Sequence, residues 1–225
     1  MIRLVLFDID GTLIRTGGAG VRAFMKAFEE QFSIRDGEDK LNFSGRTDRS
    51  LVREFFTIHG IEVSPKNFER FAVSYLFWLE KFLHEHKGSV CAGVTDFFDG
   101  LKSLPEPPLT GLLTGNLRRG AELKLRHYNL WHHFSFGGFA DDNEDRDQIA
   151  AVAHQRGSQR LNRKLHGHEV LVVGDTHLDI RCARAIGAKV LAVATGTVTE
   201  SELAAHNPDW LCRDLTEISV KDVCF

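Results

Sequence analysis

Two acidic residues stand one residue apart where an apolar run ends: the segment VLFDIDGTLI carries Asp8 and Asp10, followed at once by Gly11 and Thr12. Burying a carboxylate costs free energy unless it meets a cation or several hydrogen-bond donors. A carboxylate can attack phosphorus when a metal ion neutralises the electrophile, and a second acid can protonate the leaving alcohol and then activate water. The pattern therefore favours covalent phosphoryl chemistry, with Asp8 as nucleophile and Asp10 as acid and base.

Polar groups also follow two later apolar runs. Thr114, Gly115 and Asn116 come directly after GLL, and Asp175 comes directly after VLVVG. If the strands are parallel, these ends meet at the edge of the sheet where ligands bind in such folds. Carboxylates, a hydroxyl and glycine-containing turns fit Mg²⁺ together with a phosphate group. Each group alone is also typical of a turn or a helix cap, so it is their recurrence at three strand ends that indicates a site.

The elements that would position these residues alternate between strand and helix. Short apolar runs predict buried strands, and the stretches between them have helical spacing. The predicted strands cover residues 4–9, 110–113, 170–173 and 190–194, and the predicted helices cover residues 119–128, 148–156 and 178–186. Strands that are apolar on both faces and alternate with helices predict an α/β fold, a doubly wound, Rossmann-like parallel sheet.

One stretch, from about residue 16 to 86, interrupts this alternation. It shows three helical segments, at 21–32, 50–60 and 67–86, and no convincing strand. The third is rich in aromatic residues at helical spacing, which is typical of the core of a helical bundle rather than of a binding surface. We therefore predict an all-helical cap domain over residues 16–87, inserted after the first strand of an α/β core that comprises residues 1–15 and 88–225.

Composition narrows the classes of partner. The 225 residues are 43% apolar and 26% charged, with a formal net charge of −3, and lysine and arginine are scattered. We therefore expect no nucleic-acid partner. No apolar stretch approaches the roughly 20 residues of a membrane-spanning helix, so we expect no membrane partner. The four cysteines are far apart and form no CxxC pair, which favours reduced thiols and a cytoplasmic location. No sequence feature indicates an oligomeric state.

Three segments, DIDGT, LLTGN and GDTHLD, resemble three of the four motifs of the haloacid dehalogenase superfamily, in the order in which that superfamily uses them. The helical insertion is similar to the cap of its phosphoglycolate phosphatase branch, and the resemblance covers essentially the whole chain. It implies that Asp8 is the nucleophile, Asp10 the general acid and base, and Thr114 a ligand of the transferred phosphoryl group. Gly115 and Asn116 would shape the same substrate-binding loop.

The resemblance also implies a metal site. Mg²⁺ would be held by Asp8, the main-chain carbonyl of Asp10 and Asp175, with Asp179 supporting the site. The implied activity is a Mg²⁺-dependent phosphatase that hydrolyses a small-molecule phosphomonoester through an aspartyl-phosphate. Two alternatives stay open: a phosphomutase of the β-phosphoglucomutase type, which would differ in its cap contacts, and a non-catalytic binding protein of the same fold. Phosphoglycolate, a sugar phosphate and a nucleotide are all compatible substrates.

One position departs from the superfamily's pattern, which usually has a lysine between the second and last motifs. The expected region, GGFADDNEDRDQIAAVA, contains none; Lys124 follows Thr114 too closely, and Lys164 is already near the next strand. We expect Arg146 to take this role, because a guanidinium can neutralise a carboxylate and a phosphate together. Its removal would then abolish most activity with little change in melting temperature. Alternatively, Arg146 pairs only with the acidic run at 141–145.

The predicted cap contains a second candidate segment, SGRTDRSL, at Ser44–Leu51. It has the pattern of a loop that opens a helix, with Thr47 or Asp48 as the capping residue. In related phosphatases a cap loop closes over the core site and contacts the substrate. Arg46 is therefore predicted to meet an anionic leaving group, although a solvated loop arginine is an equally good interpretation.

Overall fold

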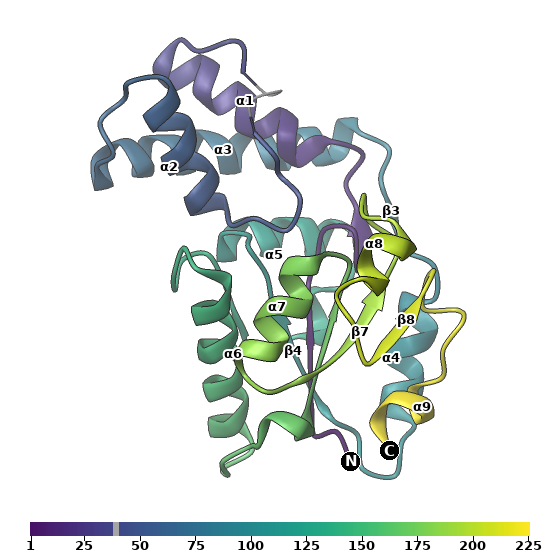
Figure 1. Ribbon diagram of the computed structural model, residues 1–225. Helices are drawn as coiled ribbons and strands as arrows, with labels where there is room; N and C mark the ends of the chain where they lie inside the picture. Colours follow the sequence, from purple (N-terminus) through teal and green to yellow (C-terminus); the bar gives the residue numbers. More distant parts are fainter. Residues whose placement is uncertain (38–40) are drawn as a thin grey trace.

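The computed structural model describes residues 1–37 and 41–225, and its central feature is a six-stranded sheet in which every neighbouring pair is parallel (Figure 1). The strand order is β5-β4-β1-β6-β7-β8. The strands are β1 (Leu4–Phe7), β4 (Leu109–Leu113), β5 (Gly137–Gly138), β6 (Val170–Gly174), β7 (Lys189–Val193) and β8 (Trp210–Cys212). The predicted doubly wound α/β sheet is confirmed. The edge strands β5 and β8 were not predicted, because neither is a long apolar run.

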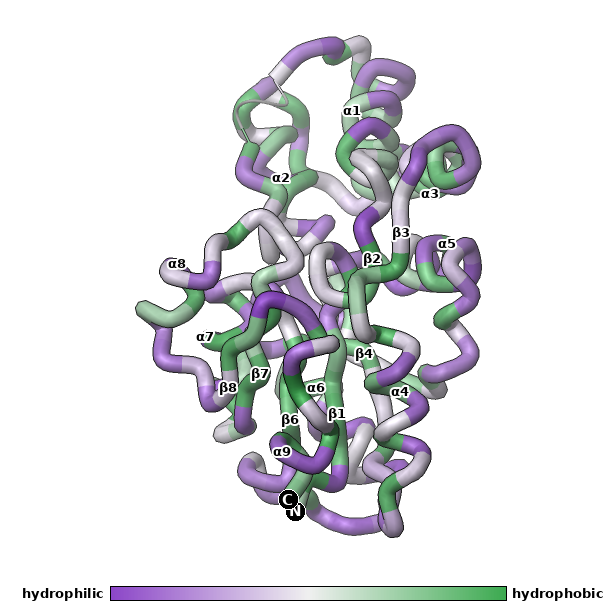
Figure 2. The backbone as a smooth tube through the Cα atoms, turned by 90° about the vertical axis from the view of Figure 1, so that its right-hand side faces the viewer, coloured by the Kyte–Doolittle hydropathy of each residue, from purple (hydrophilic) through white to green (hydrophobic). Residues whose placement is uncertain are grey.

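Helices cover both faces of this sheet, and the alternation of side chains along β1 shows why both faces are apolar. Val5 and Phe7 point to one face, where they pack with α4 (Val94–Lys102), α5 (Arg118–His127) and α9 (Val220–Cys224). Leu4 and Leu6 point to the other face, toward α6 (Arg146–Arg160), α7 (His177–Ala185) and α8 (Glu200–Ala204). Figure 2 shows β1 and β6 as hydrophobic strands in the middle of the molecule. A strand buried on both faces is expected to be apolar throughout.

A layer of three helices lies above the carboxyl ends of the strands (Figure 1). We call α1 (Ala19–Phe32), α2 (Asp48–Ile58) and α3 (Pro65–Glu85) the helical layer; the short antiparallel strands β2 (Ile14–Arg15) and β3 (Ser89–Val90) precede and follow it. The three helices occur where the spacing predicts them. The assignment of residues 16–87 to a separate cap domain stays a prediction.

The helical layer has an aromatic core of its own. Phe24, Phe28, Phe55 and Phe71 are buried and in ring contact with one another, with centroids 4.4–5.8 Å apart in the closest pairs. The interpretation of the aromatic α3 face as bundle core is therefore confirmed for most of it. Phe77 is the exception, because 61% of the residue's surface is exposed.

The order of the central strands brings the predicted motifs together. Phe7 at the end of β1 pairs with Leu112 of β4 on one side and with Val173 of β6 on the other. The residues that follow these three strands therefore meet at one edge of the sheet, directly beneath the helical layer. None of the helices in the described ranges is both long and apolar enough to cross a bilayer.

Candidate active site

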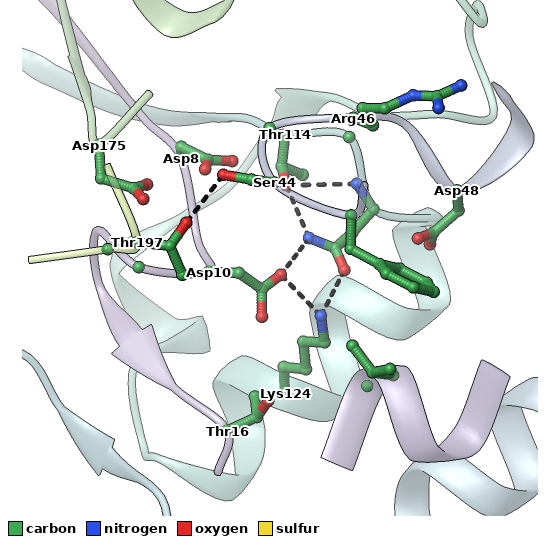
Figure 3. A pocket seen from close by; sticks show the side chains of 18 of the residues that line it. Asp8, Asp10, Thr16, Ser44, Arg46, Asp48, Thr114, Lys124, Asp175 and Thr197 are labelled. Atoms are coloured by element: carbon green, nitrogen blue, oxygen red, sulfur yellow. Dashed lines mark hydrogen bonds and ion pairs between the residues drawn. The ribbon is translucent and has the colours of Figure 1, made fainter. Parts of the chain in front are cut away.

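A cavity of about 350 Å³ lies between this sheet edge and the helical layer. Its volume is in the range of pockets that hold small molecules. Eight of the predicted site residues line it: Asp8, Asp10, Arg46, Thr114, Gly115, Asn116, Arg146 and Asp175. Figure 3 shows the carboxylates of Asp8 and Asp10 and the hydroxyl of Thr114 around one opening, with Asp175 at its edge. Asp179 is fully buried and does not line the cavity.

Three carboxylates are crowded at the end of β6 and β1. Asp8, Asp175 and Asp179 each offer an oxygen within 4.8 Å of the others. Burial raises the pKa of the Asp8 carboxyl to about 6, against the lowering effect of the Arg146 charge. Burial, together with the charges of Asp179 and Asp8, raises the pKa of Asp175 well above its usual value. The crowded negative charge therefore favours either protonation or the approach of a cation.

Asp175 is held by close packing as well as by a hydrogen bond. The Thr12 hydroxyl donates to its Oδ1 at 2.9 Å. A Cβ placed on Gly196 would stand only 1.7 Å from its Oδ2, and one on Gly11, whose φ is +85°, would stand 2.3 Å away. These two positions must be glycine for the carboxylate to lie here. The alternative interpretation of Asp175 as a helix N-cap is wrong, because Thr176 caps α7.

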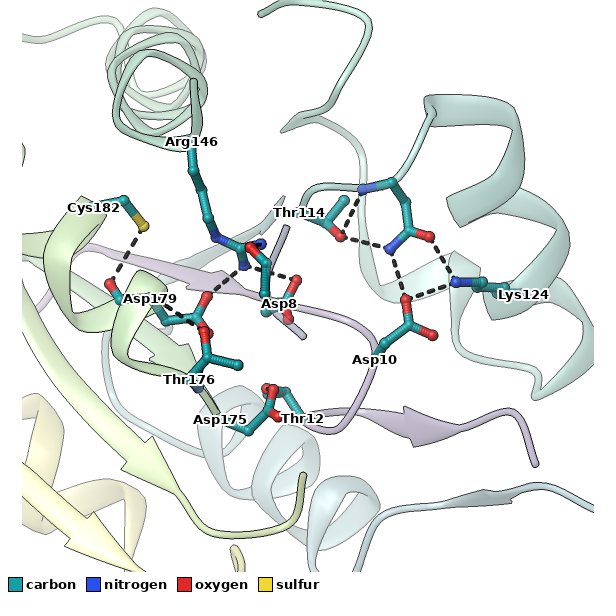
Figure 4. A network of polar contacts seen from close by, with 12 residues as sticks. Asp8, Asp10, Thr12, Thr114, Lys124, Arg146, Asp175, Thr176, Asp179 and Cys182 are labelled. Atoms are coloured by element: carbon teal, nitrogen blue, oxygen red, sulfur yellow. Dashed lines mark hydrogen bonds and ion pairs between the residues drawn. The ribbon is translucent and has the colours of Figure 1, made fainter. Parts of the chain in front are cut away.

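Arg146 is the first residue of α6 and is almost completely buried, with 3% of its surface exposed. Its Nη2 lies 3.0 Å from Asp8 Oδ1 and also contacts Asp179 Oδ1, while its Nη1 donates to the Gly45 carbonyl at 3.0 Å (Figure 4). A planar guanidinium can serve several acceptors at once in this way. The structure thus brings Arg146 to the predicted nucleophile.

The acidic run that would have held Arg146 at the surface has other partners. Asp142 pairs with Arg156 at 2.7 Å, and Glu144 pairs with Arg53 at 2.7 Å. The alternative in which Arg146 pairs only with this run is therefore wrong.

The Asp179 carboxylate binds Arg146 and the start of α7, so it offers no free oxygen to a metal ion. Its Oδ2 accepts hydrogen bonds from the Thr176 main-chain N–H at 3.0 Å and from the Thr176 hydroxyl at 2.7 Å. Its Oδ1 accepts from Arg146. Both carboxylate oxygens are therefore engaged, which fits a supporting role beside a metal site.

A second cation, Lys124, reaches the site from α5. It is 4% exposed, and its Nζ donates to Asp10 Oδ2 and to Asn116 Oδ1, each at 2.6 Å. Asn116 Nδ2 in turn donates to Asp10 Oδ2 and to Thr114 Oγ1, each at 2.8 Å. Figure 4 shows Lys124 and Arg146 on opposite sides of the two aspartates. The spacing argument excluded Lys124 only as the superfamily's missing lysine beside the nucleophile; the structure places it in the site, where it contacts Asp10 rather than Asp8.

The segment from Phe43 to Asp48, which we call the docking loop, closes the cavity from the helical layer. Thr47 Oγ1 donates to the Glu144 carbonyl at 2.9 Å and also caps α2, as predicted. The Asp48 N–H donates to the Gly115 carbonyl at 2.7 Å, and Asp48 Oδ2 accepts from the Leu117 N–H at 2.7 Å. These contacts cross from the helical layer to loops of the sheet and seat the docking loop on the cavity.

Arg46 contributes its main chain to the cavity more than its charge. A Cβ on Gly115 would stand 2.2 Å from the Arg46 carbonyl oxygen, so the two loops touch at a position that requires glycine. Its guanidinium pairs with Glu54 of α2 at 2.5 Å, and Figure 3 shows the side chain directed away from Asp8 and Asp10. The predicted contact between Arg46 and a leaving group stays a prediction.

Sequence reasoning missed Thr12, Thr176 and Lys124. The segment RRGAELKLRH did contain a signal for Lys124, because this lysine lies on the same buried helix face as Gly120, Ala121 and Leu125. A lysine on an apolar helix face is rarely fully buried without a partner. Thr12 and Thr176 each adjoin a predicted acid, which was the available signal for them.

The fold and this site together define a doubly wound α/β protein with an acid-rich pocket at its strand ends. The family model of the haloacid dehalogenase-like hydrolases matches residues 5–193, and the chain belongs to this family of hydrolases. It is similar to pyrophosphatase PpaX of Anoxybacillus flavithermus (24% identity) and of Bacillus mycoides (27%), each match spanning 221 residues, 96% of this chain and 95% of the relative.

Solved structures share the fold. CbbY from Rhodobacter sphaeroides, in complex with phosphate, superposes with a TM-score of 0.80 at 17% identity and full coverage of both chains. A predicted phosphoglycolate phosphatase from Haemophilus somnus gives a TM-score of 0.74 at 19% identity, covering 96% of each chain. At these identities the similarity establishes the fold.

The residues at the strand ends fit a hard divalent cation. Asp8 and Asp175 offer oxygen donors only, which Mg²⁺ prefers. Two of the three carboxylates in this cluster, Asp8 and Asp179, contact the Arg146 guanidinium. The pKa values of Asp8 and Asp175 are raised by burial first and by the neighbouring carboxylate charges after it. A bound cation would stabilise the ionised form of both.

Proposed function

We propose that this hydrolase is a Mg²⁺-dependent phosphatase that cleaves a small phosphomonoester through an aspartyl-phosphate on Asp8. The observation that carries the proposal is the pair of aspartates, each backed by its own buried cation, at the mouth of one cavity: Asp8 by Arg146 and Asp10 by Lys124. Phosphate or pyrophosphate chemistry in the names of the similar proteins agrees with it. The cavity volume supports a small leaving group.

In the first step, an Asp8 carboxylate oxygen forms a bond to phosphorus as the bond to the leaving oxygen breaks. Arg146 reduces the repulsion between this carboxylate and the phosphoryl group, and Thr114, which lines the same cavity as Asp8, binds a phosphoryl oxygen through its hydroxyl. Asp10 gives its proton to the leaving oxygen, which departs as an alcohol.

In the second step, water attacks the aspartyl-phosphate while Asp10 takes up a proton from that water. The bond between Asp8 and phosphorus breaks, inorganic phosphate leaves, and Asp8 is again a carboxylate. Mg²⁺, held by Asp8, Asp175 and the main-chain carbonyl of Asp10, would supply charge neutralisation of the phosphoryl oxygens.

Four buried, unpaired cysteines support the proposed cytoplasmic location of this activity.

The test is release of inorganic phosphate from 4-nitrophenyl phosphate and from a panel of phosphate esters, by the wild-type protein and by Asp8→Asn. We expect turnover that requires Mg²⁺ and a loss of at least about 10³-fold in Asp8→Asn, because the nucleophile itself is removed. Mass spectrometry after rapid quenching should show a phosphoryl group on Asp8. Activity in excess chelator, or an active Asp8→Asn protein, would overturn the proposal; isomerised phosphate esters without phosphate release would indicate a mutase.

A further inference from the structure

Lys124 places a charged side chain in a buried position, which is unfavourable in free energy. The residue is 4% exposed, the other buried residues of its helix are Gly120, Ala121 and Leu125, and taking a charge out of water costs free energy. An apolar side chain would fill the same position at lower cost. A buried charge of this kind needs an explanation in what it contacts.

Its contacts converge on one atom of the proposed acid and base. Asp10 Oδ2 accepts from Lys124 Nζ at 2.6 Å and from Asn116 Nδ2 at 2.8 Å, and Lys124 Nζ also holds the Asn116 amide oxygen at 2.6 Å. Asn116 Nδ2 is shared with the Thr114 hydroxyl. Asp10 Oδ1 accepts no hydrogen bond from the residues in the described ranges. One oxygen of Asp10 is thus clamped, and the other is left for a different partner.

We propose that Lys124 is the positioning residue of proton transfer: with Asn116 it clamps Asp10 Oδ2, so that Asp10 Oδ1 faces the leaving oxygen of the substrate. The proposal rests on the phosphatase function above and assigns Lys124 to the leaving-group half of that reaction. Arg146, which contacts Asp8 and Asp179, serves the nucleophile half. In this chain two cations of different chemistry therefore support the two halves of one reaction.

A purely structural role for Lys124 would predict something different. If Lys124 only linked α5 to the loop at Thr114, its loss would loosen the whole site and lower kcat/KM for every substrate by a similar factor. As a positioning residue of the proton donor, it matters in proportion to how much the leaving oxygen needs a proton. Acidic phenols leave without one, and less acidic phenols do not.

The experiment measures kcat/KM for a series of substituted phenyl phosphates, from 4-nitrophenyl phosphate to unsubstituted phenyl phosphate, because kcat/KM reports the step in which the phenol leaves. The variants are Lys124→Met, which removes the charge, and Lys124→Gln, which keeps a neutral donor. Arg126→Met is the matched control, since Arg126 lies on the same helix, is 61% exposed at its side chain and pairs with Glu122 away from the cavity-lining residues. Asp10→Asn is the positive reference.

We expect Lys124→Met to lose about 10²-fold on phenyl phosphate, the scale of general acid catalysis, and less than about 10-fold on 4-nitrophenyl phosphate. Its dependence on leaving-group acidity should approach that of Asp10→Asn. Lys124→Gln should recover part of the loss on phenyl phosphate, and Arg126→Met should follow the wild type. Melting curves identify any variant that does not fold, and Lys124→Gln then carries the comparison.

Equal losses on all phenyl phosphates would overturn the positioning role. That outcome differs from failure of the proposed function. If wild-type protein hydrolyses the series and Asp8→Asn does not, the function stands and only the role of Lys124 falls. If wild-type protein hydrolyses none of them, the function itself is wrong.

Discussion

Two buried cations enter the same cavity from opposite sides and differ in how far their contacts reach. Arg146 contacts Asp8, Asp179 and the Gly45 carbonyl, so it joins α6, α7, the end of β1 and the docking loop. Lys124 contacts Asp10 and Asn116, which both belong to loops of the sheet. The guanidinium therefore connects the proposed nucleophile to the helical layer, and the ammonium does not.

The difference follows from the chemistry of the two groups. A guanidinium presents five donors in one rigid plane and can hold acceptors on two edges, whereas an ammonium is a compact charge with three donors. A lysine at position 146 would neutralise Asp8 but would reach the docking loop only by giving up a carboxylate. The arginine in this chain thus couples the seating of the docking loop to the charge beside Asp8.

Of the variants that test this comparison, removal of the Arg146 guanidinium should have the largest effect on activity. We expect Arg146→Ala to lower kcat/KM by about 10²–10³-fold, as for removal of a preorganised electrostatic donor. The structure corrects the expectation of an unchanged melting temperature: Arg146 is 3% exposed and its loss leaves two buried carboxylates without their cation, which costs about 3–5 kcal/mol. Phosphate release and thermal melting measure the two effects.

Arg156→Ala is the control for this variant. Arg156 lies on the same helix, pairs with Asp142, and is 40% exposed at its side chain, so its loss should change the rate little. An Arg146→Ala protein with near-normal kcat/KM would contradict the electrostatic role.

A smaller effect is expected from Arg146→Lys, which sharpens the comparison between the two cations. The ammonium retains the charge beside Asp8 and should recover part of the activity that Arg146→Ala loses, while the bond to the Gly45 carbonyl is lost. Hydrogen exchange should then become faster at the Asp48 amide, which donates to the Gly115 carbonyl across the closed docking loop. Lys124→Met, measured in parallel, should leave that amide unchanged. Equal protection in Arg146→Lys and wild type would show that the docking loop does not depend on the guanidinium.

The smallest expected effect is on stability and concerns Asp48, the docking-loop residue whose carboxyl is influenced by the Lys124 charge. Burial raises the pKa of the Asp48 carboxyl to about 6, against the lowering effect of Lys124. The folded state then takes up a proton more readily than the unfolded state, whose carboxyl titrates at about 4, so stability falls as pH rises from about 4 to about 6. Asp48→Asn removes this titration and keeps an oxygen to accept from the Leu117 N–H.

The melting temperature of Asp48→Asn relative to wild type should therefore rise between pH 4 and pH 7 and then level off. A difference of about 1 kcal/mol corresponds to roughly 2–4 °C in a chain of this length. A relative melting temperature that falls over the same interval would mean that Lys124 stabilises the Asp48 charge, and hence that the Lys124 side is also tied to the docking loop.

The positions of Asp8, Thr114 and Asp175 could be read from the sequence because each is fixed by a local rule. Each follows a short apolar strand, and the carboxyl ends of neighbouring parallel strands meet at one edge of the sheet. Arg146 was predicted as a substitute for a missing lysine. Its contact with Asp179 and the Gly45 carbonyl was not, because both partners depend on how α7 and the docking loop pack against α6.

Lys124 shows where local rules end. Asp10 and Lys124 are 114 residues apart, and they meet because α5 follows β4, which pairs with β1. The spacing from Thr114 argued against Lys124 as the superfamily's missing lysine, but it gave no information about a contact with Asp10. Likewise, the sequence placed Arg46 in a loop, but only the packing of that loop on Gly115 and the position of Glu54 decided where its charge would point. Strand ends are set by the backbone pattern of a few residues, whereas the partner of a long charged side chain is set by which elements pack around it.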